Sequence, residues 1–184
     1  MKTEIEIKYT VDFQAIPKNI LRVAKKMEIS QGYISVANPE ERVRKSKTGE
    51  EIKYTYTTKC DVRTDGLVRQ EKEKEIDEAG FQKLWPQTKG RRIAKTRYNI
   101  PYQYIDVQTK KSKNVMIELD QYHKNSHLAG LLVAEVEFDS TELVKRFIAP
   151  TWFRKNVTAD KNFKNKNLAI MNKERAKILI DSSK

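Results

Sequence analysis

Charged and apolar residues alternate along most of the chain, and this pattern restricts the fold more than any other feature. In "TEIEIKYT", residues 3–10, Glu4, Glu6 and Lys8 alternate with isoleucines. Side chains two residues apart lie on the same face of a strand, so these three charges share one face. Comparable segments predict eight strands, which are enough to close a barrel. They lie at 2–10, 31–37, 40–46, 51–60, 67–76, 92–102, 114–122 and 130–138.

Seven of the eight predicted strands carry two or more charged residues on one face. The basic members are Lys8, Arg42, Arg44, Lys53, Lys59, Arg69, Lys95 and Arg97. The acidic members are Glu4, Glu6, Glu71, Glu73, Glu75, Glu118, Asp120, Glu135 and Glu137. One such strand is ordinarily a solvated sheet face. Seven such strands together have many apolar faces, which other parts of the chain must shield from water.

Four predicted helices can supply this cover, at 12–29, 77–86, 139–150 and 166–180. In the first, apolar residues recur at helical spacing on one face. They are Ile16, Ile20, Val23 and Met27. Helices packed outside a closed sheet force the charged faces into its interior. We therefore predict an α+β fold, a closed eight-stranded antiparallel β-barrel with a charged lumen and helices outside. We expect a single domain over residues 1–184.

A charged lumen indicates function, because buried charge is expensive unless it is paired or binds an ion or ligand. Arginine and lysine side chains from several strands suit the oxygens of a polyphosphate. Clustered carboxylates suit a hard divalent cation such as Mg²⁺ or Mn²⁺. A lumen that binds metal and phosphate together accounts for both sets of charges.

Composition narrows the remaining classes of protein. The net charge is +12, which favours a polyanionic partner. A nucleic-acid-binding module would use that charge on its outer surface, but it does not explain the paired carboxylates. The single Cys60 excludes a disulfide framework within the chain. No apolar run approaches the ~20 residues that span a bilayer, and the N-terminus does not resemble a signal peptide. We expect a soluble cytoplasmic protein.

The order of the charged motifs resembles the CYTH superfamily, the triphosphate tunnel metalloenzymes. "EIEIK" matches the ExExK signature of that superfamily, and the similarity extends over residues 2–169. The later motifs are "RVR", "YTTK", "RQEKEKEI", "GRRIAKTRY", "IELD", "AEVEF" and "VTADKNFKN". Residues 67–98 are particularly similar to bacterial single-domain members. The resemblance implies an antiparallel tunnel that binds a triphosphate and a divalent metal. Bacterial members of this branch cleave tripolyphosphate to pyrophosphate and phosphate.

The resemblance also implies roles for individual residues, with Glu4, Glu6 and Lys8 at the catalytic centre. The implied metal ligands are Glu4, Glu6, Glu135 and Glu137. Phosphate oxygens would contact Lys8, Arg42, Arg44, Lys59, Arg69, Lys95 and Arg97. Supporting acidic residues would be Glu71, Glu73, Glu118 and Asp120. The chain departs from the family pattern at Phe163, where members usually carry a tyrosine.

Three alternatives use the same tunnel: a thiamine triphosphatase, an adenylate cyclase of the class IV type, and a polyphosphate-binding protein without catalysis. A thiamine triphosphatase would need an aromatic or acidic patch at a tunnel mouth, and we interpret Trp85 and Trp152 as core residues instead. An adenine pocket is not visible in the sequence. The pattern does not predict the oligomeric state, the preferred metal, or a choice between one and two metal ions.

Overall fold

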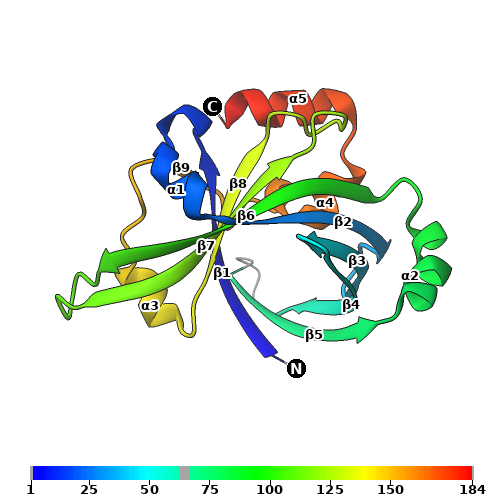
Figure 1. Cartoon of the computed structure of the whole chain (residues 1–184), viewed down its shortest axis with the longest axis horizontal. Helices are drawn as coiled ribbons and strands as arrows, with labels where there is room; N and C mark the ends of the chain where they lie inside the picture. The colour runs from blue at the N-terminus through cyan, green and yellow to red at the C-terminus, as the bar shows by residue number, and fades with distance from the viewer. Residues whose placement is uncertain (1, 63–66, 184) are drawn as a thin grey trace.

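The barrel predicted from the alternating charges is present in the computed structural model, which describes residues 2–62 and 67–183. Within these residues, nine strands form one sheet in the order β5-β4-β3-β2-β6-β7-β8-β1-β9. An additional pairing of β5 with β1 closes eight of them into an antiparallel barrel (Figure 1). The strands are β1 (Lys2–Val11), β2 (Lys25–Ser35), β3 (Glu40–Thr48), β4 (Glu51–Asp61), β5 (Val68–Ile76), β6 (Arg92–Ile105), β7 (Ser112–Tyr122), β8 (Leu132–Glu137) and β9 (Phe153–Asn156).

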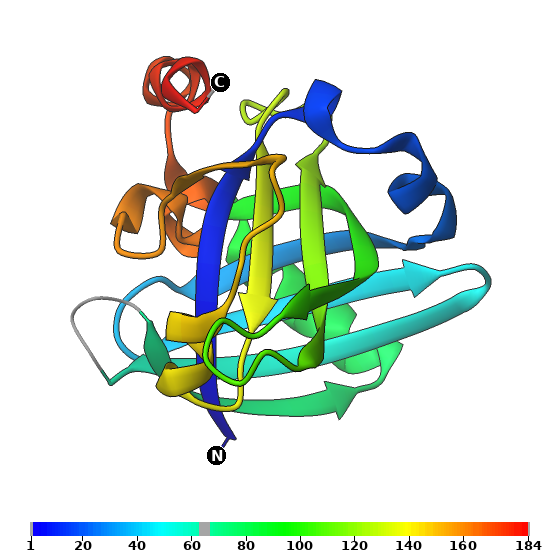
Figure 2. The ribbon, with the colours of Figure 1, turned by 90° about the vertical axis from the view of Figure 1, so that its left-hand side faces the viewer.

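Short helices lie around the barrel wall, as Figures 1 and 2 show from two directions. Three single 3-10 turns, η1, η2 and η3, accompany them. The elements are α1 (Lys18–Val23), α2 (Glu78–Leu84), α3 (Thr141–Arg146), α4 (Asn165–Ile170), α5 (Lys173–Ser182), η1 (Phe13–Ala15), η2 (Trp85–Thr88) and η3 (Lys161–Phe163). Every helix in the described part of the chain is too short or too polar to cross a lipid bilayer.

The predicted helix over 12–29 is wrong for its second half. Helix α1 ends at Val23, and the chain from Lys25 to Ser35 is strand β2, which begins six residues before the predicted strand. Met27, expected on a helix face, pairs with Arg97 of β6 instead. The reason is that β2 pairs with β3 on one side and with β6 on the other. Sheet pairing on both sides outweighs a weak helical pattern.

Two further differences lie in the last third of the chain. The predicted single helix over 166–180 is two helices, because α4 ends at Ile170 and α5 begins at Lys173. Asn172 caps α5, since its side chain accepts a hydrogen bond from the backbone N–H of Arg175. Strand β9 was not predicted, and it pairs with β1 beside the tunnel wall.

The apolar faces of the strands point outward and are covered, as predicted. Ile5, Ile7, Ile117 and Val136 belong to one buried cluster on the outside of the wall, together with Trp152. Trp152 is therefore a core residue, as expected. Trp85 is half-buried at the edge of a smaller cluster, where its ring stacks on Phe81 with centroids 5.0 Å apart.

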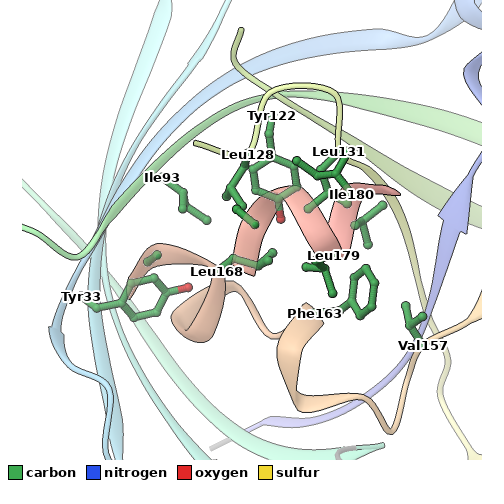
Figure 3. Close-up of a cluster of buried hydrophobic side chains, with 13 residues drawn as sticks. Tyr33, Ile93, Tyr122, Leu128, Leu131, Val157, Phe163, Leu168, Leu179 and Ile180 are labelled. Atoms are coloured by element: carbon green, nitrogen blue, oxygen red, sulfur yellow. The ribbon is translucent and has the colours of Figure 1, made fainter. Parts of the chain in front are cut away.

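A second apolar cluster joins the C-terminal helices to the barrel. In Figure 3, Tyr33, Ile93 and Tyr122 of the barrel strands surround Leu168 of α4. Phe163 of η3 belongs to the same cluster and is buried, so the departure from the usual tyrosine places an apolar ring in an apolar setting. This packing fixes α4, and with it Asn165, against the barrel.

Candidate active site

A cavity of about 480 Å³ lies inside the barrel, and charged side chains of both signs line it. Its cationic residues are Lys2, Lys8, Arg42, Arg44, Lys59, Arg69, Lys72, Arg97 and Lys164. Its acidic residues are Glu4, Glu6, Glu40, Glu71, Glu73, Glu118, Glu135, Glu137 and Asp160. Among the residues that the structure describes, the nine cations and nine carboxylates of the lining cancel formally. The net charge of +12 is therefore carried by the rest of the chain.

The barrel brings together thirteen of the fifteen residues predicted for the site. The thirteen lining residues are Glu4, Glu6, Lys8, Arg42, Arg44, Lys59, Arg69, Glu71, Glu73, Arg97, Glu118, Glu135 and Glu137. The other two, Lys95 and Asp120, are fully buried and pair with each other. Lys95 was expected to contact phosphate, but its ammonium group is directed at Asp120 and, at 3.4 Å, at Asn165 Oδ1.

Arg97 is held by three carboxylates. Its Nε and Nη2 atoms donate to the two oxygens of Asp120 at 2.7 Å each, and Nη2 also donates to Glu135 at 2.6 Å. Nη1 pairs with Glu118. Burial acts to lower the pKa of Arg97, but the three carboxylates outweigh burial and raise it well above its usual value. Arg97 is therefore a rigid, permanently charged part of the wall.

Arg44 is in the opposite situation. Among the described residues it makes no ion pair, and its buried Nε atom has no hydrogen-bond partner. Burial and the neighbouring guanidinium groups of Arg42 and Arg97 together lower the pKa of Arg44 to about 10. The buried Nε atom of Arg42 also lacks a partner. Both arginines line the cavity, and Arg42 has one long ion pair there, with Glu71 at 3.5 Å. An anion in the cavity would therefore meet two guanidinium groups with donor capacity left.

Three carboxylates of the cavity form a group that could hold a metal ion. One oxygen from each of Glu4, Glu6 and Glu137 lies within 4.8 Å of the others. Burial and the charge of Glu135 together raise the pKa of Glu6 to about 7. Carboxylates crowded in this way fit a hard divalent cation, which prefers oxygen ligands and would offset their repulsion.

Each carboxylate of this group is paired with a lysine. The closest pair joins Lys59 Nζ to both oxygens of Glu4, at 2.6 and 2.7 Å. In the other two pairs the shortest N···O distances are 3.3 and 3.1 Å. They are Lys8–Glu6 and Lys2–Glu137.

Glu135, implied as a metal ligand by the family resemblance, stands apart from the other three. It pairs with Lys8 at 2.7 Å and with Arg97 at 2.6 Å, and it accepts from Asn165 Nδ2 at 3.4 Å. Burial acts to raise the pKa of Glu135, but Lys8 and Arg97 outweigh it and hold that pKa well below its usual value. The register explains the arrangement, because Glu135 lies directly across from Lys8 in the β1–β8 pair.

The cavity also contains residues that were not predicted. Glu40 is 2% exposed and accepts from Arg69 Nη2 at 2.7 Å. It lies two residues before Arg42 in β3, so the alternation could have identified it. Lys164 pairs with Asp61 at 3.1 Å, and Asn165 begins α4. These two residues lie outside the strands, where a period of two carries no information.

The sequence and the fold are similar to those of known proteins. No protein-family model matches the chain. An inorganic triphosphatase of Nitrosomonas europaea is 38% identical over 168 residues, which cover 91% of this chain and 97% of that protein. The crystal structure of an inorganic triphosphatase superposes with a TM-score of 0.60 at 34% identity, over 94% of this chain and 97% of the other.

A protein from Pyrococcus horikoshii shares the fold at lower similarity. It has a TM-score of 0.54 at 23% identity, over 78% of this chain and 82% of that one. Three observations indicate the same family: the charged lumen, the closed barrel and the extent of the Nitrosomonas match. The chain belongs to the bacterial inorganic triphosphatase branch of the CYTH superfamily of triphosphate tunnel metalloenzymes.

Proposed function

We propose that this protein hydrolyses inorganic tripolyphosphate to pyrophosphate and phosphate with the help of a divalent cation. One observation carries the proposal: a single cavity contains two guanidinium groups with unsatisfied Nε atoms, those of Arg42 and Arg44, and a separate group of crowded carboxylates. The name of the 38% identical Nitrosomonas relative, inorganic triphosphatase, supports the same substrate.

Arg42 and Arg44 are the residues we assign to phosphoryl oxygens first, because their Nε atoms have no partner. A guanidinium group can bind two phosphate oxygens at once. We assign Lys59 and Arg69, which line the same cavity, to the remaining oxygens. Phosphoryl transfer depends chiefly on positioning and on neutralising the charge of the phosphoryl and leaving groups, which these cations would supply.

We assign Glu4, Glu6 and Glu137 to the divalent cation, Mg²⁺ or Mn²⁺. When bound, such an ion would neutralise charge and polarise a phosphoryl oxygen. Glu135 then serves to orient Lys8 and Arg97 rather than to bind the ion.

The remaining predicted residues take supporting roles in the proposal. Asp120 fixes Arg97 and Lys95. Glu71 pairs with Lys59 at 3.1 Å, and Glu73 accepts from Thr57 Oγ1 at 2.8 Å. Glu118 contacts Arg97.

Water is the nucleophile that we propose. No serine, cysteine or histidine is among the described residues that line the cavity, so a covalent intermediate on such a side chain is not part of the mechanism. The apolar lining consists of Tyr33, Val157 and Phe163. This small surface favours an inorganic substrate over thiamine triphosphate or ATP. We place the protein in the cytoplasm, because a chain with the single cysteine Cys60 carries no internal disulfide framework of the kind typical of oxidising compartments.

Two substitutions test the assignment, each with the same control. Glu6→Gln and Arg44→Met should each lower kcat/KM for tripolyphosphate by about 10²–10³, the usual loss when one charge-stabilising group is removed. Lys53→Met is the control, because Lys53 lies in β4, a strand of the same barrel, but pairs with Glu51 on the exposed surface. Wild-type kcat/KM in both cavity variants would overturn the proposed function.

A further inference from the structure

Lysines of the chain itself already neutralise the candidate cation group. Lys59, Lys8 and Lys2 pair with its three carboxylates, at the distances given above. Lys59 makes the closest of the three pairs, because its ammonium group contacts both oxygens of Glu4. A divalent cation that entered beside Glu4 would therefore meet a positive charge at its ligand.

Lys59 is confined to this position in the free protein. It is 5% exposed, and its Nζ atom also lies 3.1 Å from Glu71. It comes from β4, whereas Glu4 and Glu71 come from β1 and β5, the strands whose pairing closes the barrel. The ammonium group thus holds two carboxylates on two different strands.

Elsewhere in the same cavity two guanidinium groups are incompletely paired, although Arg42 Nη2 lies 3.5 Å from Glu71. Arg44 has no ion pair among the described residues, and the Nε atoms of Arg42 and Arg44 lack partners. A triphosphate bound to these guanidinium groups would place several negative oxygens in a cavity that Lys59 also lines. Those oxygens compete with Glu4 for the ammonium group of Lys59, and a lysine side chain is long and flexible enough to follow them.

We propose that Lys59 is a tethered counter-ion that blocks the cation site in the free protein and releases it when a triphosphate binds. The identity of the anion rests on the proposed function. The described part of the cavity lining is formally neutral, which supports the coupling, because either ligand alone would unbalance its nine cations and nine carboxylates. A bound anion therefore raises the affinity for the cation, and a bound cation raises the affinity for the anion by the same factor.

Mn²⁺ binding without any anion tests the blocking role, measured by electron paramagnetic resonance on the whole protein. Lys59→Met should bind Mn²⁺ more tightly than wild type, by roughly 5- to 150-fold, the usual span of coupling between two sites. Lys164→Met is the matched control, because Lys164 is a cavity lysine that pairs with Asp61. An affinity of Lys59→Met no higher than that of Lys164→Met overturns the proposal.

The reciprocal experiment uses Glu4→Gln, a substitution of nearly equal size, and covers the case in which Lys59→Met does not fold. Calorimetry in EDTA measures tripolyphosphate binding without turnover. In Glu4→Gln, Lys59 is free to bind the anion, so the affinity for tripolyphosphate should increase by a factor similar to that expected for Mn²⁺ binding by Lys59→Met. Glu73→Gln is the control, since Glu73 is a cavity carboxylate that accepts from Thr57. If Glu4→Gln gains no more than Glu73→Gln, the counter-ion role is refuted.

These measurements separate the two proposals. Wild-type protein that does not cleave tripolyphosphate would overturn the proposed function, whereas tighter Mn²⁺ binding by Lys59→Met would still establish the counter-ion. Normal cleavage of tripolyphosphate by wild type, together with an unchanged Mn²⁺ affinity of Lys59→Met, would support the proposed function and overturn the counter-ion.

Discussion

Replacing Arg44 by methionine should stabilise the protein and weaken its binding of triphosphate at the same time. The guanidinium group of Arg44 is largely removed from water without an ion-pair partner in the described part of the chain, and its Nε atom is unsatisfied. Burial and two neighbouring guanidinium groups lower its pKa from the usual value to about 10. At about 1.36 kcal/mol per pKa unit, this lowering corresponds to about 3 kcal/mol of unfavourable interaction.

Water in the cavity reduces that cost, so we expect Arg44→Met to raise the free energy of unfolding by about 1–3 kcal/mol, the range for an unsatisfied buried polar group. Urea denaturation should show a higher midpoint with an unchanged slope. In a chain of this length, the melting temperature should rise by roughly 2–4 °C per kcal/mol. Arg92→Met is the control, since Arg92 lies 4.2 Å from the Trp85 ring and bonds to Thr88, and its loss should destabilise.

Tripolyphosphate should reverse the order of stability of wild type and Arg44→Met. In EDTA, tripolyphosphate at about 100 times its dissociation constant should stabilise wild type by about 2.7 kcal/mol. Arg44→Met should gain much less at the same concentration, because it lacks the unpaired guanidinium group. A variant less stable than wild type without ligand, or one equally stabilised by tripolyphosphate, would refute the reasoning.

Three further predictions concern the wall behind the cavity. Asp120→Asn should lower the free energy of unfolding by about 3–5 kcal/mol in urea, because Arg97 and Lys95 share this fully buried carboxylate; a loss below about 1 kcal/mol would contradict the ion-pair network. Leu168→Ala should cost about 2–5 kcal/mol by the same assay, since Leu168 is fully buried where α4 meets the barrel; an unchanged midpoint would contradict that packing. Burial lowers the pKa of Lys95 from 10.5 to about 8, so between these values only the unfolded state holds the proton, and stability relative to Lys95→Met should rise with pH. A stability difference between wild type and Lys95→Met that stays constant from pH 7.5 to 10 would contradict the lowered pKa.

That the charges of each strand share one face could be predicted because the geometry of a strand fixes it, and their inward direction followed from the helices available to cover the apolar faces. Once Glu4, Glu6 and Lys8 belong to one strand, they must share a face, whatever the strand packs against. The failure near Met27 shows the limit of this reasoning. Ile16, Ile20 and Val23 fit a helix for only about two turns. The beginning of β2 had to be inferred from a short segment in which either period is acceptable.

The pairing of charges within the lumen could not be predicted, because it depends on the register of strands that are distant in sequence. The β1–β8 register places Lys8 across from Glu135 and Glu6 across from Glu137. Because Glu135 faces a lysine and Glu137 faces Glu6, Glu137 joins the candidate metal ligands and Glu135 does not. The contact between Lys59 and Glu4 likewise requires closure of the barrel through β5, which no local pattern specifies.

Phosphate release from tripolyphosphate tests the central claim most directly. The assay compares Mg²⁺, Mn²⁺ and EDTA, with ATP and thiamine triphosphate measured alongside. We predict rapid release from tripolyphosphate with a divalent cation, none in EDTA, and little from the two organic triphosphates. Tight binding of tripolyphosphate without release under any of these conditions would contradict a hydrolase and identify a polyphosphate-binding protein.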